Sequence, residues 1–234
     1  MTNSSATEAD VGLAPCRVAW LGRDVDYNDA WVLQKRLVDK RVDATTPDTL
    51  LLLEHSQVYT AGRRSEPEHV LLDEAGLRAT GIPVVETDRG GQVTYHGPGQ
   101  LVGYPIISLT ERDMGPKQYV RTLESVLLGA LADLDVTAGL ISGLTGVWAE
   151  GAKVAAIGVK ISRGVTMHGF ALNVEPDMGA YDHIVACGIT DREVTSIVKL
   201  LGRSVAMDVV RARVTHHFAK WFGVQVALVE AEAL

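Results

Sequence analysis

Two residues of this sequence carry side chains that could perform covalent chemistry, Cys187 and Lys153. Cys187 precedes Gly188, where a turn could leave its sulfur accessible, although free cysteines are more often small buried hydrophobic residues. A thiol with a pKa of about 8.5 is only a few per cent ionised at pH 7, so a nucleophilic role requires a positive or basic neighbour. The residues around Cys187 leave both interpretations open.

Lys153 directly precedes a short apolar run, Val154 to Ile157. Such a run could partly remove the amine from water, and loss of water lowers the pKa of a lysine. The ordinary alternative is a charge at the edge of a strand, and the local sequence favours that alternative. The residues next to Lys153 therefore do not by themselves indicate a chemical role for its amine.

Residues 88–107 form a glycine-rich stretch, with five glycines, Arg89, His96 and two tyrosines. Glycines allow a ligand to approach the backbone closely, so we expect the wall of a binding site here. A plain hairpin that only turns is the alternative. Nucleotide binding is not favoured, because Gly97 and Gly99 are followed by Gly103, one place too far for the dinucleotide motif, and no phosphate loop occurs.

The seven histidines show no spacing typical of a metal site, and we predict none. His96 and His168 each lie beside a glycine in a strand-like segment, so each could belong to a site or be structural. His216 and His217 are expected at the surface of a helix.

The composition of the chain is typical of a globular protein, with 234 residues, 47% hydrophobic and 22% charged. We expect a lead-in without order over residues 1–15 and a single domain over residues 16–234. The net charge of −7 argues against nucleic-acid binding, and no apolar run reaches the ~18–20 residues of a membrane span. Two distant cysteines, Cys16 and Cys187, fit a reducing cytoplasm, and Cys16 is expected to have no role.

Hydrophobic periodicity predicts strands grouped in blocks, with helices between and after them, which favours an α+β fold with mixed or antiparallel sheets. The expected strands are 17–21, 50–53, 57–60, 82–87, 146–148, 153–161 and 165–174, with two more joined by a tight turn at residues 96–99. The expected helices are 27–38, 73–80, one opened by Pro116, 191–201 and 207–222. Trp221 is expected on the apolar stripe of the last helix.

Several segments together resemble the lipoyl(octanoyl) transferases, the lipoate-protein ligase B family. The matching segments are 58–63, 88–100, 146–148, 153–158, 168–173 and 186–189, with Thr195 and Ser196. They span most of the chain in the order of the family, and the long glycine-rich motif is highly specific. The sequence departs from the family where Ser56 follows His55 in place of the usual proline, and where Ala152 precedes Lys153 in place of a basic residue.

The resemblance implies the α+β fold of the biotin and lipoate protein ligases. It implies a cysteine nucleophile at Cys187 and an activating lysine at Lys153. The implied substrate wall consists of Arg89, Gly90, Gly91, Gln92, Val93, Thr94, Tyr95, His96, Ala156, Ile157, Gly158, Gly169, Phe170 and Ala171.

The implied reaction transfers an octanoyl group from octanoyl-acyl-carrier protein to a lysine of a lipoyl domain, through an acyl thioester on the cysteine and without a cofactor. The implied acceptors are the apo lipoyl domains of 2-oxoacid dehydrogenase complexes and the glycine cleavage H protein. Because carrier proteins of this kind are acidic, we expect a basic docking patch that includes Arg63, Arg64 and Arg163. The rival interpretations are an ATP-dependent lipoate or biotin ligase on the same fold and a silent acyl-binding module.

Overall fold

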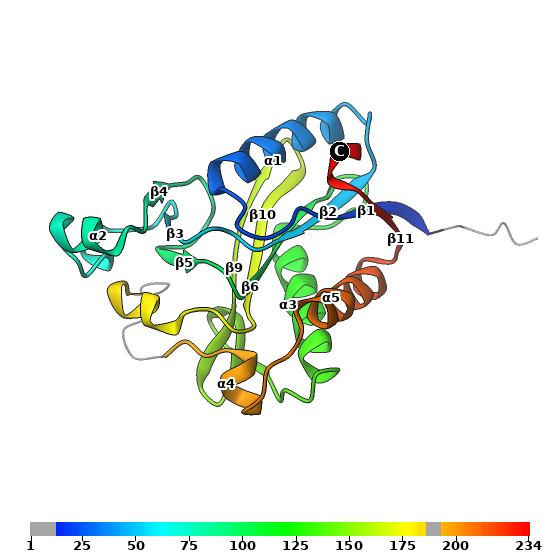
Figure 1. The fold of residues 1–234 in the computed structure, drawn as a ribbon. Helices are drawn as coiled ribbons and strands as arrows, with labels where there is room; N and C mark the ends of the chain where they lie inside the picture. Colours follow the sequence, from blue (N-terminus) through cyan, green and yellow to red (C-terminus); the bar gives the residue numbers. More distant parts are fainter. Residues whose placement is uncertain (1–12, 186–192) are drawn as a thin grey trace, which may run out of the picture.

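The computed structural model describes residues 13–185 and 193–234. Within these ranges the main sheet has eight strands in the order β11-β1-β2-β6-β10-β9-β8-β7 (Figure 1). β1 pairs in parallel with β2 and β11, whereas the other pairs are antiparallel. The strand bounds are β1 Ala14–Trp20, β2 Asp48–Leu53, β6 Gln100–Ile106, β7 Gly139–Ile141, β8 Leu144–Ala149, β9 Ala152–Ser162, β10 Val165–Asn173 and β11 Val224–Val229.

A second sheet contains β4 (Val84–Glu86), β3 (Val58–Ala61) and β5 (Thr94–His96) in that order. The turn predicted at residues 96–99 is present, with the Gln100 N–H donating to Gly97 O at 3.1 Å. The strands that it joins do not pair with each other, because β5 pairs with β3 and β6 pairs with β2 and β10. The glycine-rich stretch therefore connects two sheets and is not a hairpin.

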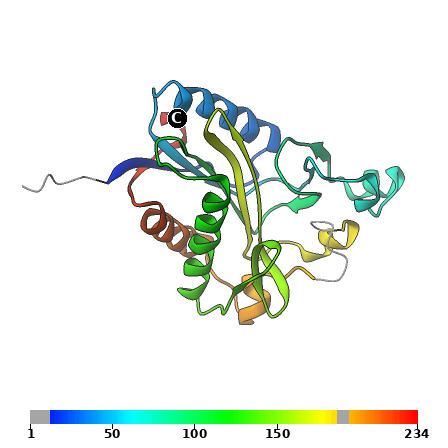
Figure 2. The same ribbon diagram turned by 180° about the vertical axis from the view of Figure 1, so that it is seen from behind.

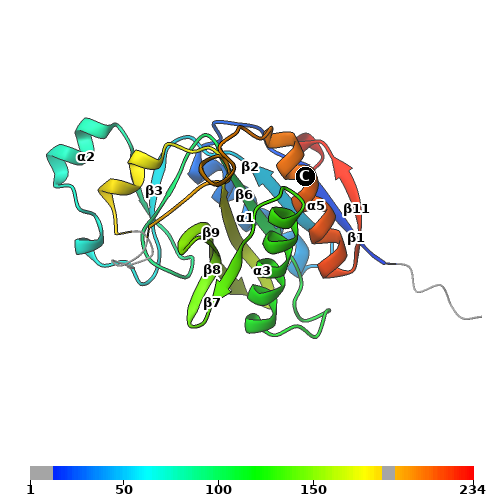
Figure 3. The same ribbon diagram turned by 90° about the horizontal axis from the view of Figure 1, so that it is seen from below.

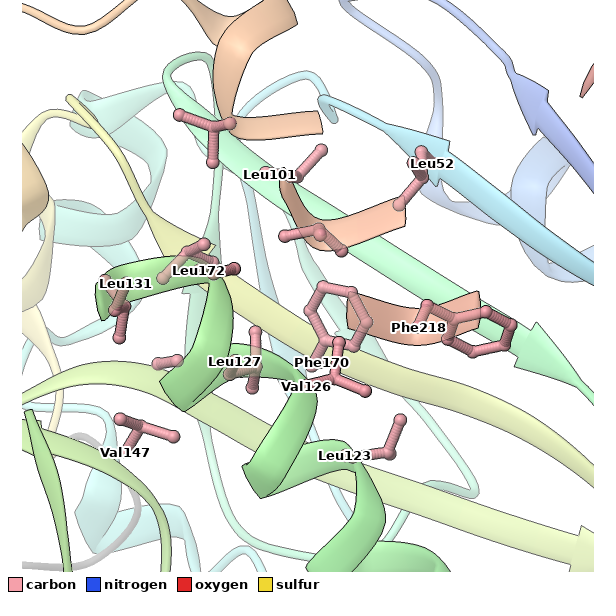
Figure 4. Packing of buried hydrophobic residues seen from close by; sticks show 14 of the residues in the cluster. Leu52, Leu101, Leu123, Val126, Leu127, Leu131, Val147, Phe170, Leu172 and Phe218 are labelled. Atoms are coloured by element: carbon pink, nitrogen blue, oxygen red, sulfur yellow. The ribbon is translucent and has the colours of Figure 1, made fainter. Parts of the chain in front are cut away.

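Helices cover both faces of the main sheet (Figures 1 and 2). α3 (Pro116–Ala132) and α5 (Met207–Phe222) pack on one face, and α1 (Tyr27–Val42) packs on the other. In Figure 4, Leu123 and Leu127 of α3 and Phe218 of α5 lie against Phe170 and the neighbouring strands. α1 begins after Asp26, whose carboxylate accepts from two backbone N–H groups of the first turn, and α5 ends at Gly223 in the left-handed conformation.

The second sheet and the short helix α2 (Glu74–Thr80) lie to one side of the main body (Figure 3), and residues of this region form a smaller third core. It includes Tyr59, Tyr95 and Ile184. The other short helices of the described residues are α4 (Ile197–Leu201) and the 3-10 turns η1 (Pro67–His69), η2 (Met178–His183) and η4 (Ala231–Ala233). Together these elements confirm the predicted α+β class.

Several boundaries differ from the sequence predictions. β1 begins at Ala14, so the last two residues of the expected lead-in are paired with β11, and Cys16 is fully buried. α4 begins at Ile197, because Ser196 caps it and the residues just before it bond to Lys153. β7 and β11 were not predicted. Trp221 is half exposed, and His217 is buried with its ring bonded to Asp133.

In the two described ranges, none of the helices combines the length and the apolar character that crossing a membrane demands.

Candidate active site

A cavity of about 340 Å³ opens where β9, β10 and β6 meet the first residues of the glycine-rich stretch. Every residue of the predicted substrate wall lines it except Val93 and Tyr95, and Lys153 lines it as well. The remaining lining residues are Arg64, Val102, Tyr104, Gly143, Leu144 and Thr145. Segments that lie far apart in the sequence are therefore brought together around one space.

Val93 and Tyr95 were predicted in the wall but lie outside it. Side chains of a strand alternate between its two faces, so Thr94 and His96 face the cavity while their neighbours face away. Both neighbours are buried in the third core, where the Tyr95 ring lies 5.8 Å from that of Tyr59. Their placement indicates that they hold the wall in position from behind.

Residues 88–92, here called the wall loop, are held by backbone hydrogen bonds from two sides. Gly90 N–H donates to Val159 O of β9 at 2.9 Å, and Arg64 N–H donates to Gly91 O at 3.0 Å. The contact with β9 is so close that a Cβ atom on Gly158 would lie 2.8 Å from Gly90 O. A side chain at Gly158 would therefore push the wall loop away from the sheet.

Asp88 anchors the start of the wall loop to β9 and β10. Its carboxylate accepts from Lys160 Nζ at 2.6 Å and from His168 Nε2 at 2.7 Å. Burial opposes the ionisation of Asp88, but these two hydrogen bonds outweigh it and lower the pKa of the carboxyl. Burial lowers the pKa of His168 to about 4, although Asp88 favours its charged form.

The hydrogen bonds beside the cavity fix the proton positions of two more histidines. His55 Nδ1 lies 2.9 Å from Val25 O, which can only accept, so Nδ1 carries the proton. Burial lowers the pKa of His55 to about 4, so its other nitrogen is unprotonated at neutral pH and accepts from the Tyr104 hydroxyl at 2.7 Å. Tyr104, whose hydroxyl hydrogen is thus used by His55, is one of the residues that line the cavity.

His96 is fixed in the same way through Gln100. The amide nitrogen of Gln100 donates to Tyr95 O and Asn173 Oδ1, so its oxygen accepts from His96 Nδ1 at 2.7 Å. Burial lowers the pKa of His96 well below its usual value, and the ring is neutral. His96 and Tyr104 thus line this part of the cavity as neutral side chains whose polar groups are held by Gln100 and His55.

Lys153 is the second residue of β9 and is only 7% exposed. The interpretation of this residue as an exposed charge at the edge of a strand is therefore wrong. The backbone N–H of Lys153 donates to Glu193 O, and the backbone carbonyl of Lys153 accepts from Thr195 N–H, both at 2.9 Å. Glu193 follows Cys187 by six positions in the chain. Cys187 itself lies outside the described residues.

Cys16, the other cysteine, is a poor candidate for a nucleophile. It is fully buried in the core, and burial together with the nearby carboxylate of Asp48 raises its pKa to about 12. A thiol of this kind stays protonated and unreactive at neutral pH. Among the described residues, no cluster of His, Cys, Asp and Glu could hold a metal ion.

Comparison with known proteins identifies the family. Residues 26–219 match the lipoyl protein ligase A/B catalytic domain. The chain belongs to this family. It is 54% identical over 193 residues to an octanoyltransferase of Mycobacterium tuberculosis, which covers 81% of this chain and 80% of that protein. It is 48% identical over 210 residues to an octanoyltransferase of Mycolicibacterium gilvum, which covers 87% and 84%.

Solved structures of the family share the fold. Lipoate-protein ligase A bound with ATP superposes with a TM-score of 0.73 over 92% of this chain and 89% of that chain, at 17% sequence identity. The comparisons confirm the resemblance predicted from the sequence motifs, and the fold that the resemblance implied.

Five cavity residues were missed by the sequence predictions. Val102 and Tyr104 lie inside the glycine-rich stretch, but their role depends on β6 entering the main sheet, which the expected hairpin did not provide. Gly143 lies in the β7–β8 connection, Leu144 and Thr145 are the first two residues of β8, and β7 was not predicted. The available signal was the glycine at 143 before a strand, which is typical of a turn but says nothing about a cavity.

Proposed function

We propose that this chain is an octanoyltransferase of lipoate biosynthesis that works through an acyl thioester on Cys187. The octanoyltransferases that share half of its residues support the reaction class. The observation that carries the mechanism is the buried Lys153 amine in the wall of the cavity, bonded through its backbone to the segment that follows Cys187.

In the first step the Cys187 thiolate attacks the thioester carbonyl of octanoyl-acyl-carrier protein. The carrier sulfur leaves as a thiolate and takes a proton from the Lys153 ammonium, which leaves Lys153 neutral, and the octanoyl group is held on the enzyme as a new thioester. One thioester replaces another, so this step is nearly balanced in free energy. The positive charge of Lys153 stabilises the attacking thiolate.

In the second step a lysine amine of a lipoyl domain attacks the octanoyl thioester. The amine loses a proton as the amide forms and the Cys187 sulfur leaves, and Lys153 in its neutral form accepts that proton. An amide is more stable than a thioester, which gives the reaction its direction. The family supports a lipoyl-domain acceptor in general. The acceptors that we propose are the lipoyl domains of 2-oxoacid dehydrogenase complexes and the glycine cleavage H protein.

Backbone N–H groups of the wall loop stabilise the oxyanion that forms in both steps. Gly90 is a poor donor for this purpose, because its N–H already donates to Val159 O. Gly91, in the left-handed conformation at φ +91°, is the better candidate. The volume of the cavity lies in the range usual for small-ligand sites, and Ala156, Ile157 and Ala171 supply apolar surface for an eight-carbon tail.

The donor docks on the loop that carries Arg63 and Arg64, both of which are exposed, and Arg64 also lines the cavity. Arg163 does not extend this patch, because its guanidinium is paired with Asp39 of α1. The cytoplasmic location expected from the sequence remains part of the proposal.

Mass spectrometry after mixing with octanoyl-acyl-carrier protein tests the mechanism. We expect one octanoyl adduct on the peptide that contains Cys187, its loss in Cys187→Ser, and its retention in Cys16→Ser as the matched control. No adduct together with activity that requires ATP would favour a ligase. Full function of Cys187→Ser would favour a silent acyl-binding module.

A further inference from the structure

The buried ammonium of Lys153 lies over the ring of Trp148, with Nζ 4.8 Å from the ring centroid. Both side chains are almost completely buried. Across residues 13–185 and 193–234, no carboxylate forms an ion pair with Lys153. The aromatic face of Trp148 is thus the contact that compensates this charge for its loss of water.

An irregularity between β8 and β9 creates this pair. Val147 faces Ala155, but the next residue, Trp148, faces Lys153, so β9 contains one extra residue at this point. In an uninterrupted antiparallel ladder Trp148 would face Val154. Val154 and Ala155 both point into the main core, and the bulge turns Lys153 toward the cavity and toward the ring.

The space for the lysine stem depends on Gly146, two residues before Trp148. A Cβ atom there would lie 2.6 Å from Ala155 O and 3.5 Å from Lys153 Cε, and its φ of +116° also requires glycine. The N–H of Gly146 donates to the buried carboxylate of Glu124 in α3 at 3.1 Å. β8 is therefore tied to α3 at the position where it must leave room for Lys153.

An aromatic partner and a carboxylate partner differ in how much of the electric field of the Lys153 ammonium reaches a neighbouring group in the cavity. A carboxylate would hold the ammonium in its charged form but would cancel most of its field. A ring attracts the cation through its quadrupole and adds no net charge, so the full positive charge remains available to the cavity. The other charged side chains that line the cavity, Arg64 and Arg89, add to this positive field.

We propose that Trp148 is a positioning residue that holds the Lys153 side chain directed into the cavity without adding a negative charge that would cancel its field. This inference rests on the proposed function, in which the Lys153 charge stabilises a thiolate. It predicts that the face of the ring, and not the volume of the side chain, sets the rate at which the enzyme is acylated.

Single-turnover octanoylation of Trp148→Leu and Trp148→Phe tests this prediction, with the folded fraction checked by circular dichroism. We expect Trp148→Leu to slow acylation roughly tenfold, equivalent to about 1.4 kcal/mol, with the KM for the donor unchanged. Trp148→Phe retains a ring face and should stay within about threefold of the parent chain. Trp20→Leu, which removes a ring that contacts Arg211 away from the cavity, is the matched control and should leave the rate unchanged.

A double-mutant cycle separates the contact from general packing. In a Lys153→Met background, Trp148→Leu should have little further effect, because the charge that the ring serves is already gone. Equal losses in both backgrounds, equal rates for Trp148→Leu and Trp148→Phe, or a raised KM would overturn the inference. Failure of the parent chain to form any adduct would instead overturn the proposed function.

Fluorinated tryptophan provides a test that preserves the shape of the side chain. Each added fluorine weakens the attraction of the ring for a cation, so the acylation rate should fall stepwise with the number of fluorine atoms. The same series in Trp148→Phe should show no trend, since the other tryptophans of the chain do not contact Lys153. A rate independent of fluorination in the parent chain would contradict the inference.

Discussion

Buried positive charge is handled in opposite ways at Asp48 and at Lys153. The Asp48 carboxylate accepts from Arg41 Nε at 2.8 Å and from Arg112 Nη2 at 2.6 Å, and Glu111 also pairs with Arg41. The hydrogen bond to Glu111, with help from Asp48, raises the pKa of Arg41. Lys153, by contrast, has the ring of Trp148 and an open cavity beside it.

This difference indicates what each region is for. The Asp48 cluster, made of Asp48, Arg41, Arg112 and Glu111, joins the end of α1 and the start of β2 to the segment after β6, and its charges balance one another. A balanced cluster holds elements together but offers little field to a ligand. The charge of Lys153 is uncompensated by any described carboxylate, which costs stability but leaves the charge available for chemistry.

Replacing Lys153 tests whether its charge serves chemistry, and it should give the largest effect on the rate of octanoyl transfer. Lys153→Met should lower the rate of octanoyl transfer by about 10²–10⁴-fold, because both thiolate stabilisation and proton acceptance are lost. Its free energy of unfolding should stay the same or rise, since a buried charge without a carboxylate partner is removed. Steady-state kinetics and urea unfolding measure the two quantities. A large loss of stability would show that Lys153 is structural.

Removing the carboxylate of Asp48 tests whether the Asp48 cluster stabilises the fold. Asp48→Asn should lower the free energy of unfolding by about 3–5 kcal/mol, because the buried guanidinium of Arg41 and the partly buried one of Arg112 lose their shared partner. The activity of the protein that remains folded should be unchanged. Asp39→Asn, which removes an exposed partner of Arg163, is the matched control and should cost less than about 0.5 kcal/mol. Equal effects of the two substitutions in urea unfolding would contradict the comparison.

The sequence predicted the elements around the cavity better than their pairing. The periodic spacing of apolar residues predicted α1, α3 and α5, with the predicted bounds within a few residues of the observed ones. The similarity of the motifs to the family predicted most of the residues of the cavity wall. β11 was missed because its pairing with β1 depends on residues about 200 positions away. The bulge that turns Lys153 inward depends on the register between β8 and β9, and no local signal marks it. Contacts distant in sequence are settled by packing rather than by local preference.

Buried histidines extend the comparison to groups that are kept neutral. The pKa of His55 and that of His168 are lowered by burial to about 4, so between that value and ~6.5 the unfolded chain binds protons that the folded chain does not. Stability should therefore fall as the pH is lowered through this window, by on the order of 2–3 kcal/mol for each histidine. Urea unfolding at about pH 7 and about pH 5 measures the loss.

A matched pair of variants assigns this pH dependence. His55→Gln should reduce the loss between the two pH values, because one group that takes up a proton on unfolding has been removed. His216→Gln replaces an exposed histidine and should leave the loss unchanged. If the parent chain and His55→Gln lost the same free energy between the two pH values, the neutral state assigned to His55 would be wrong.

Exposed positive charge is the third case, and its effect should be the smallest. Arg63 and Arg64 are exposed beside the cavity, where water and salt screen them, so they are expected to act on the approach of an acidic carrier protein and not on the fold. Arg63→Glu with Arg64→Glu should raise the KM for the carrier protein by roughly five- to tenfold at low salt, and less at high salt. The free energy of unfolding should change by less than about 0.5 kcal/mol. Arg163→Glu is the control on a paired surface charge, and an equal rise in KM for this variant would move the docking patch toward the β9–β10 turn.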